Sequence, residues 1–120
     1  AVIYAYKYNV HYWSMDVKPA GLYNVPIQIV PAVNPLMLRR GDTLLLRIYK
    51  DGAPYANAPV IADVLGNLSS VMQADENGYV SVRVSNDGLN VIGVEVALPT
   101  ADVNVTKKVF SSLSFILPAE

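Results

Sequence analysis

Apolar and polar residues alternate with a period of two along most of this chain, and this pattern constrains its fold more than any other feature. In "TLLLRIYK" (residues 43–50), Leu44, Leu46 and Ile48 fall on one face, and in "GYVSVRVS" (78–85) three valines do the same. Strands with this pattern bury one face and expose the other. No segment combines a helical apolar stripe with a cap and good helix-forming residues. The chain therefore predicts β-strands throughout, with a helical turn conceivable only within Pro35–Arg40.

Turn-forming residues separate the alternating segments at the spacing expected of antiparallel β-structure. They are Asp51-Gly52, Gly66-Asn67, the run Asp75–Gly78 and the run Asn86–Gly88. Asp, Asn and Gly tolerate a positive φ at modest cost, which tight turns between strands require. We interpret "ADENG" (74–78) as the turn of a β-hairpin.

These signals predict a single all-β domain over residues 1–120, an antiparallel β-sandwich of about seven or eight strands. A single sheet would leave one apolar face in water, so the strands must close into two packed layers. The expected strands are Val2–Trp13, Ile27–Pro31, Thr43–Lys50, Val60–Leu65, Ser69–Gln73, Tyr79–Val84, Asn90–Leu98 and Val105–Leu117.

Composition excludes several classes of function. Nine Lys and Arg residues against ten Asp and Glu residues give a net charge of -1, which provides no basic field for nucleic acid. Cysteine is absent, so disulfides, thiolate metal sites and cysteine nucleophiles are excluded. No apolar stretch reaches the ~20 residues that a membrane-spanning helix needs. Because the chain begins at Ala1 without Met, we expect it to be a processed or trimmed form of a longer precursor.

Two long segments carry a family resemblance. "LYNVPIQIVPAVNPLMLRRGDTLLLRIYKDGAPYANAPVIADV" and "QADENGYVSVRVSNDGLNVIGVEV" together resemble a bacterial domain family of unknown function. That family occurs in periplasmic components associated with nickel and cobalt uptake. The resemblance covers roughly Gly21 to Leu117. It implies a transthyretin/prealbumin-like sandwich, export from the cytoplasm and an accessory role in metal handling; an immunoglobulin-like arrangement of the same fold class stays open.

Candidates for catalysis and metal binding are few. The only histidine, His11, lies in "NVHYWS", and no Gly-x-Ser-x-Gly motif positions a nucleophile, so we predict no catalytic residues and no enzyme activity. Nickel and cobalt prefer imidazole ligands, and the acidic residues are dispersed along the chain. We therefore predict no cofactor and no metal site, with His11 as the one weak candidate ligand. Asp42, directly before a strand, is expected to accept backbone N–H bonds in a turn.

The amino-terminal segment "IYAYKYNVHYW" carries the most unusual pattern. Tyr4, Tyr6, Tyr8 and Tyr12 alternate onto one face together with Val10. A tyrosine row on a strand provides broad contact area with polar tips, which suits a protein or glycan surface. Packing of the same side chains within a sheet explains the pattern equally well, because aromatic residues favour strands.

From these observations we expect a non-enzymatic module that is periplasmic or extracellular in bacteria and binds a protein partner in the cell envelope. The family resemblance implies an accessory role in nickel or cobalt uptake, with a transition metal as a further candidate ligand. The alternative is a carbohydrate-binding or adhesive surface domain that uses the tyrosine row to hold a glycan.

Overall fold

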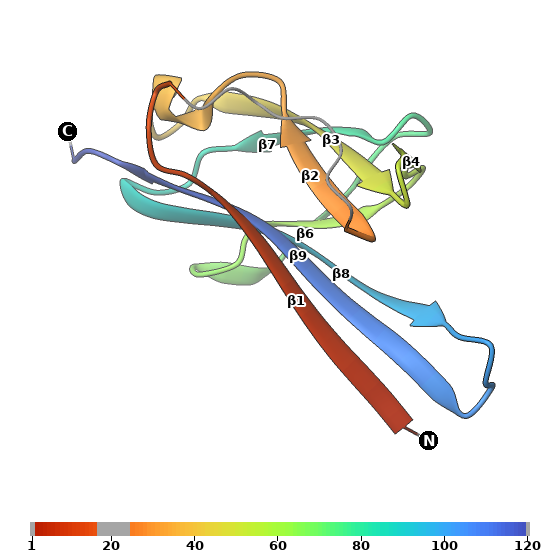
Figure 1. Ribbon diagram of the computed structural model, residues 1–120. Helices are drawn as coiled ribbons and strands as arrows, with labels where there is room; N and C mark the ends of the chain where they lie inside the picture. The colour runs from red at the N-terminus through yellow and green to blue at the C-terminus, as the bar shows by residue number, and fades with distance from the viewer. Residues whose placement is uncertain (1, 17–24, 120) are drawn as a thin grey trace.

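The computed structural model describes residues 2–16 and 25–119, and its regular structure is almost entirely β-strand (Figure 1). The predicted all-β sandwich is confirmed, and the described residues form nine strands in two sheets rather than about seven or eight. The strands are β1 (Val2–Tyr12), β2 (Ile27–Pro31), β3 (Thr43–Lys50), β4 (Ala53–Pro54), β5 (Pro59–Asp63), β6 (Asn67–Gln73), β7 (Tyr79–Arg83), β8 (Gly88–Pro99) and β9 (Val105–Leu117). A 3₁₀ turn, Pro35–Met37, follows β2.

The larger sheet has five strands in the order β1-β9-β8-β5-β6. Its centre is the antiparallel pair β8–β9, which stays in register from Gly88 opposite Leu117 to Pro99 opposite Thr106. On its other side, β9 pairs with β1 in parallel orientation, from Val2 opposite Val105 to Tyr12 opposite Phe115. This parallel pair is the one departure from the antiparallel pairing expected for the sandwich.

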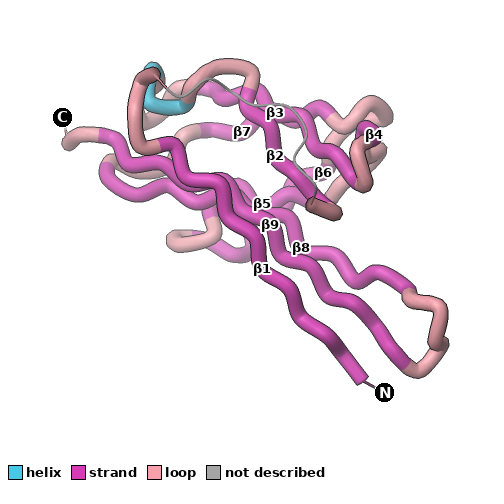
Figure 2. Tube along the Cα trace, viewed as in Figure 1, coloured by secondary structure: helices cyan, strands magenta, loops and turns pink. Residues whose placement is uncertain are grey.

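The smaller sheet is organised around β3. This strand pairs antiparallel with β2, with β7 and with the two-residue strand β4. Alternate residues of β3 are completely buried, and they are Leu44, Leu46 and Ile48, as the sequence pattern predicts. They pack against inward-facing side chains of the larger sheet, including Val94, Leu113 and Phe115. The core therefore lies between the two sheets, which Figure 2 shows as separate layers.

Two predicted turns have different outcomes. Asp51 and Gly52 both have positive φ, 49° and 84°, and join β3 to β4 in the two-residue loop of a hairpin. The turn at 75–78 forms, with Asp75 N–H donating to the Tyr79 carbonyl at 2.8 Å. However, β6 belongs to the larger sheet and β7 to the smaller one, so the prediction of a β-hairpin is wrong. The turn carries the chain from one layer to the other.

The sheets differ in length, and this difference creates an arm. The amino-terminal end of β1, the start of β9 and the end of β8 continue side by side beyond the smaller sheet (Figure 1). The molecule consequently measures 50 × 27 × 25 Å. Residues on the arm lack the second layer that covers the rest of the larger sheet.

Gly78 and Gly52 offer a matched test of the turn that joins the layers. Both have a φ of +84°, but a Cβ at Gly78 would lie 2.6 Å from the Ile48 carbonyl oxygen, whereas one at Gly52 would meet nothing within 4 Å. Gly52→Ala is expected to lower the free energy of unfolding by about 1–2 kcal/mol, the cost of a left-handed non-glycine residue. Gly78→Ala should lower the free energy of unfolding further, because the backbone at Ile48 must move away from the added Cβ. Urea unfolding of both variants measures the difference; equal losses would contradict the contact.

Candidate functional site

The tyrosine row of β1 lies on the inner face of the larger sheet, and its burial falls steadily toward the arm. Tyr12 belongs to the core with 3% of its surface exposed, and Tyr8 is half-buried against the core. Tyr6 is 43% exposed and Tyr4 is 55% exposed. One strand face thus contributes to the core at one end and forms a surface at the other.

The smaller sheet ends level with Tyr8, and this explains the change in burial. Tyr8 stands opposite Ser111 of β9, whose hydroxyl donates to the carbonyl of Ile27, the first residue of β2, at 2.6 Å. The next inner-face positions toward the amino terminus are Tyr6 and Tyr4, which lie beyond β2. Lys107, opposite Tyr4 on β9, places its ammonium group 5.1 Å from the centre of the Tyr6 ring.

Among residues 2–16 and 25–119, no strand neighbours the outer edge of β1 in the sheet order. The N–H of Val2 donates to the Asn104 carbonyl at 2.8 Å, so the peptide groups of Val2 point toward β9. Because successive residues of a strand point their peptide groups in opposite directions, the even-numbered residues of β1 bond to β9. The odd-numbered residues, Ile3, Ala5, Lys7, Asn9 and His11, therefore direct their N–H and C=O groups toward the free edge.

A cleft opens beside this edge, between β1 and β2. It has a volume of about 510 Å³ and is lined by Tyr8, Val10, Ile27 and Ile29, with polar groups from Gln28 and the β9 serines. Lys7 and Asn9 of β1 also line it. The row of exposed tyrosines, the free edge and the cleft together form the candidate site, which we call the β1 edge.

His11 lies on the opposite face of the sheet from the tyrosines, in a small polar network. Its Nδ1 is 2.8 Å from the hydroxyl of Ser114, and the Asn9 amide donates to Ser112 at 2.8 Å and to Ser114 at 3.2 Å. Within residues 2–16 and 25–119, no group of three or more His, Asp and Glu side chains is placed to hold a metal ion. The imidazole is thus hydrogen-bonded to a serine of the neighbouring strand.

Several acidic side chains are engaged in turns. Asp42 accepts the backbone N–H of Arg39 at 2.9 Å, so the prediction that its carboxylate accepts a backbone N–H in a turn is confirmed. The donor lies three residues before Asp42 in the chain. Asp75 accepts from the N–H groups of Asn77 and Tyr79 at 2.8 and 2.9 Å. These carboxylates hold loop geometry.

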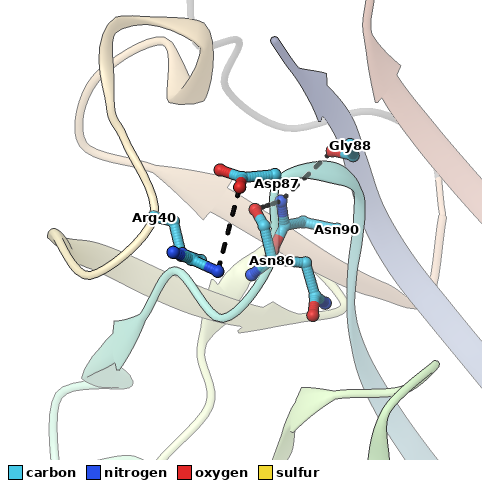
Figure 3. Close-up of polar contacts among 5 residues, drawn as sticks. All are labelled: Arg40, Asn86, Asp87, Gly88 and Asn90. Carbon is cyan, nitrogen blue, oxygen red and sulfur yellow. Dashed lines mark hydrogen bonds and ion pairs between the residues drawn. The ribbon is translucent and has the colours of Figure 1, made fainter. Parts of the chain in front are cut away.

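The connection from β7 to β8, which also crosses from one sheet to the other, is held by amide groups (Figure 3). The buried Asn90 side chain donates to the Asn86 carbonyl at 2.8 Å and accepts the Asn86 N–H at 3.1 Å. Arg40 lies 3.8 Å from Asp87 beside this turn. Both Arg40 and Asp87 line a groove of about 490 Å³ together with Leu36, Met37 and Leu117.

A cluster of aromatic and cationic side chains on the smaller sheet had no distinct signal in the sequence. The guanidinium of Arg47 lies 4.5 Å from the Tyr79 ring centre and 5.4 Å from that of Tyr49. Its Nε donates to the Asn77 carbonyl at 3.1 Å. Period-two alternation places Arg47 and Tyr49 on one face, but the sequence does not show that β7 brings Tyr79 beside them.

Comparison with protein families matches residues 12–97 to a domain of unknown function, DUF4198. The chain belongs to this family. The match includes the smaller sheet, β5, β6 and most of β8, and it leaves out β9 and all of β1 except Tyr12. Comparisons with curated proteins and with solved structures give no match. In the part of the chain that the structure describes, no helix is long and apolar enough to cross a membrane.

Substitutions along the tyrosine row should separate its two environments. Tyr12→Ala is expected to lower the free energy of unfolding by about 3–5 kcal/mol, as truncation of a buried aromatic does. Tyr4→Ala should change it by less than about 0.5 kcal/mol, because the side chain lies on the surface. Urea denaturation followed by circular dichroism measures both. A large loss in Tyr4→Ala would show that the arm is part of the folded core.

Metal binding by the isolated domain provides a second test. The chain has one histidine and no cysteine, and tight nickel or cobalt sites normally use several such ligands. Isothermal titration of tag-free protein at neutral pH is expected to show weak binding of Ni²⁺ and Co²⁺ or none. Stoichiometric submicromolar binding that disappears in His11→Ala would contradict this and make His11 a ligand.

Proposed function

We propose that this domain is a non-enzymatic interaction module of the bacterial cell envelope, periplasmic or extracellular, and that it binds a protein partner along the β1 edge. The observation that carries the proposal is the combination of an unpaired strand edge with exposed tyrosines on the same strand. A partner strand added to such an edge satisfies its backbone hydrogen bonds, and adjoining side chains provide specificity.

The physical argument begins with the edge itself. A long edge strand with apolar side chains is a ready template for pairing, and proteins usually shorten, twist or charge such edges. Here β1 runs from Val2 to Tyr12 with Lys7 as its one Lys, Arg, Asp or Glu residue. Val2 and Ile3 at its start are 49% and 64% exposed. An edge of this kind is suited to a partner.

The resemblance to periplasmic components of nickel and cobalt uptake supports the cellular setting of the proposal. Under this proposal the domain contributes to metal uptake through protein contacts. The location of His11, bonded to Ser114 on the face opposite the tyrosines, supports a role other than metal ligation for this residue.

Carbohydrate binding is the second candidate function. The observation in its favour is the pair of aromatic surfaces, Tyr4 and Tyr6 on the arm and Tyr49 and Tyr79 beside Arg47. Exposed tyrosine rings can stack on sugars and donate hydrogen bonds through their hydroxyl groups. Glycan binding that is lost on substitution of these tyrosines would favour this function over the first.

Site-specific photocrosslinking in the bacterial host tests the proposed function. A benzophenone amino acid at Ile3, on the β1 edge, is expected to form a covalent adduct with a protein. The matched control is Ile116, which is 57% exposed, close to the 64% of Ile3, but lies in β9 near the other end of the sheet. Adducts from Ile3 and none from Ile116 support the proposal. Absence of adducts at Ile3 would contradict it.

A further inference from the structure

The residues along β1 are arranged so that β1 can pair with β1 of a second copy of the chain. Resting on the interaction function proposed above, we propose that the partner is a second copy of this chain, paired antiparallel along β1 about a two-fold axis. In a two-fold pair, if residue i of one copy contacts residue j of the other, then j also contacts i. The strand must therefore be complementary to itself.

Hydrogen bonding defines which residues face one another in such a pair. The odd-numbered residues of β1 direct their peptide groups outward, as the bond from Val2 to Asn104 establishes. In the two-fold pair these residues would form the hydrogen-bonded positions. The even-numbered residues, which include the tyrosines, would occupy the non-hydrogen-bonded positions, where Cα atoms are only about 4.5 Å apart and side chains are closest.

Charge then excludes the full-length register. The longest pairing, over residues 2–12, would place Lys7 directly opposite Lys7 of the other copy, and facing like charges destabilise a strand pair. A shift to residues 2–10 places Tyr6 opposite its own copy on the two-fold axis. Lys7 then faces Ala5, Tyr4 faces Tyr8, and Val2 faces Val10. Two nine-residue pairings separate the lysines, this one and a pairing of residues 4–12 about Tyr8. Only the pairing of residues 2–10 includes Val2, which is 49% exposed at the start of the strand.

The cleft beside β1 provides the complementary surface. In this register Tyr4 and Val2 of one copy lie opposite Tyr8 and Val10 of the other, and both of those residues line the 510 Å³ cleft. The arm of one copy thus lies over the cleft between β1 and β2 of its partner. Two side chains that are 55% and 49% exposed in the single chain are covered by the apolar residues of the cleft, and the same contact occurs twice.

Sedimentation and light scattering of the purified chain test the oligomeric state. We expect a dimer that dissociates on dilution. Ala5→Pro should yield a monomer with little change in thermal stability, because Ala5 directs its N–H to the free edge and proline removes that donor. The matched control, Ala5→Val, keeps the N–H and should remain dimeric. A monomeric wild-type chain at every accessible concentration would overturn the proposal.

Cysteine substitution tests the register, since the native chain has no cysteine. Tyr6→Cys places the thiol on the two-fold axis, and oxidised glutathione should convert most of the protein into a disulfide-linked dimer. Tyr4→Cys alone should link far less, whereas a mixture of Tyr4→Cys and Tyr8→Cys chains should link efficiently. Efficient linkage of Tyr4→Cys with none of Tyr6→Cys would overturn the register.

The crosslinking experiment described above separates this inference from the proposed function. An adduct at Ile3 with a second copy supports both proposals. An adduct with a different protein, accompanied by a monomeric chain in sedimentation, retains the interaction function and overturns self-pairing. The absence of any adduct at Ile3 overturns both.

Discussion

The pairing of β8 with β9 is the constraint on which the rest of the structure depends. These strands stay in register from Gly88 opposite Leu117 to Pro99 opposite Thr106, and every residue of β1 pairs with β9. Ser111 and Leu113 of β9 connect this unit to the smaller sheet, one by a hydrogen bond to Ile27 and the other as a completely buried core side chain. The unit formed by β1, β9 and β8 is therefore both a wall of the core and the support of the arm.

The arm follows from unequal strand lengths. The smaller sheet covers the larger one only as far as Tyr8, so a single alternating face passes from core to surface within β1. Hydrophobic stabilisation depends on the area removed from water, and Tyr12 and Tyr4 therefore differ in role despite their equivalent positions in the sequence pattern. The part of the row beyond Tyr8, which comprises Tyr6 and Tyr4, therefore lies on the surface.

Local sequence patterns predicted the strands well and their partners less well. Ile27–Pro31, Thr43–Lys50 and Val105–Leu117 have the predicted bounds, and the other predicted strands differ by one or two residues at one or both ends. The two-residue strand β4 was missed because it is too short to show alternation. The sheet membership of β6 and β7 and the parallel pairing of β1 depend on distant residues, which local periodicity does not specify.

The candidate site shows the same division. Alternation predicted that the tyrosines share a face, but the extent to which each is buried depends on where β2 begins. Predicting the free edge of β1 requires the order of strands in the sheet, and predicting the cleft requires the packing of both sheets. The contact of Arg47 with Tyr79 likewise depends on the register of β3 with β7, which places these two residues opposite each other.

Amide hydrogen exchange along β1, measured residue by residue by NMR, tests most directly whether its outer edge is an interface. In dilute protein the account predicts an alternating pattern, with slow exchange at Tyr4, Tyr6 and Tyr8 and fast exchange at Ala5 and Lys7. At high concentration, the amides of Ala5 and Lys7 should become protected as β1 of a second copy pairs with them, whereas the exchange of exposed loop amides should not change. Fast exchange at Ala5 and Lys7 at every concentration would contradict self-pairing along the β1 edge.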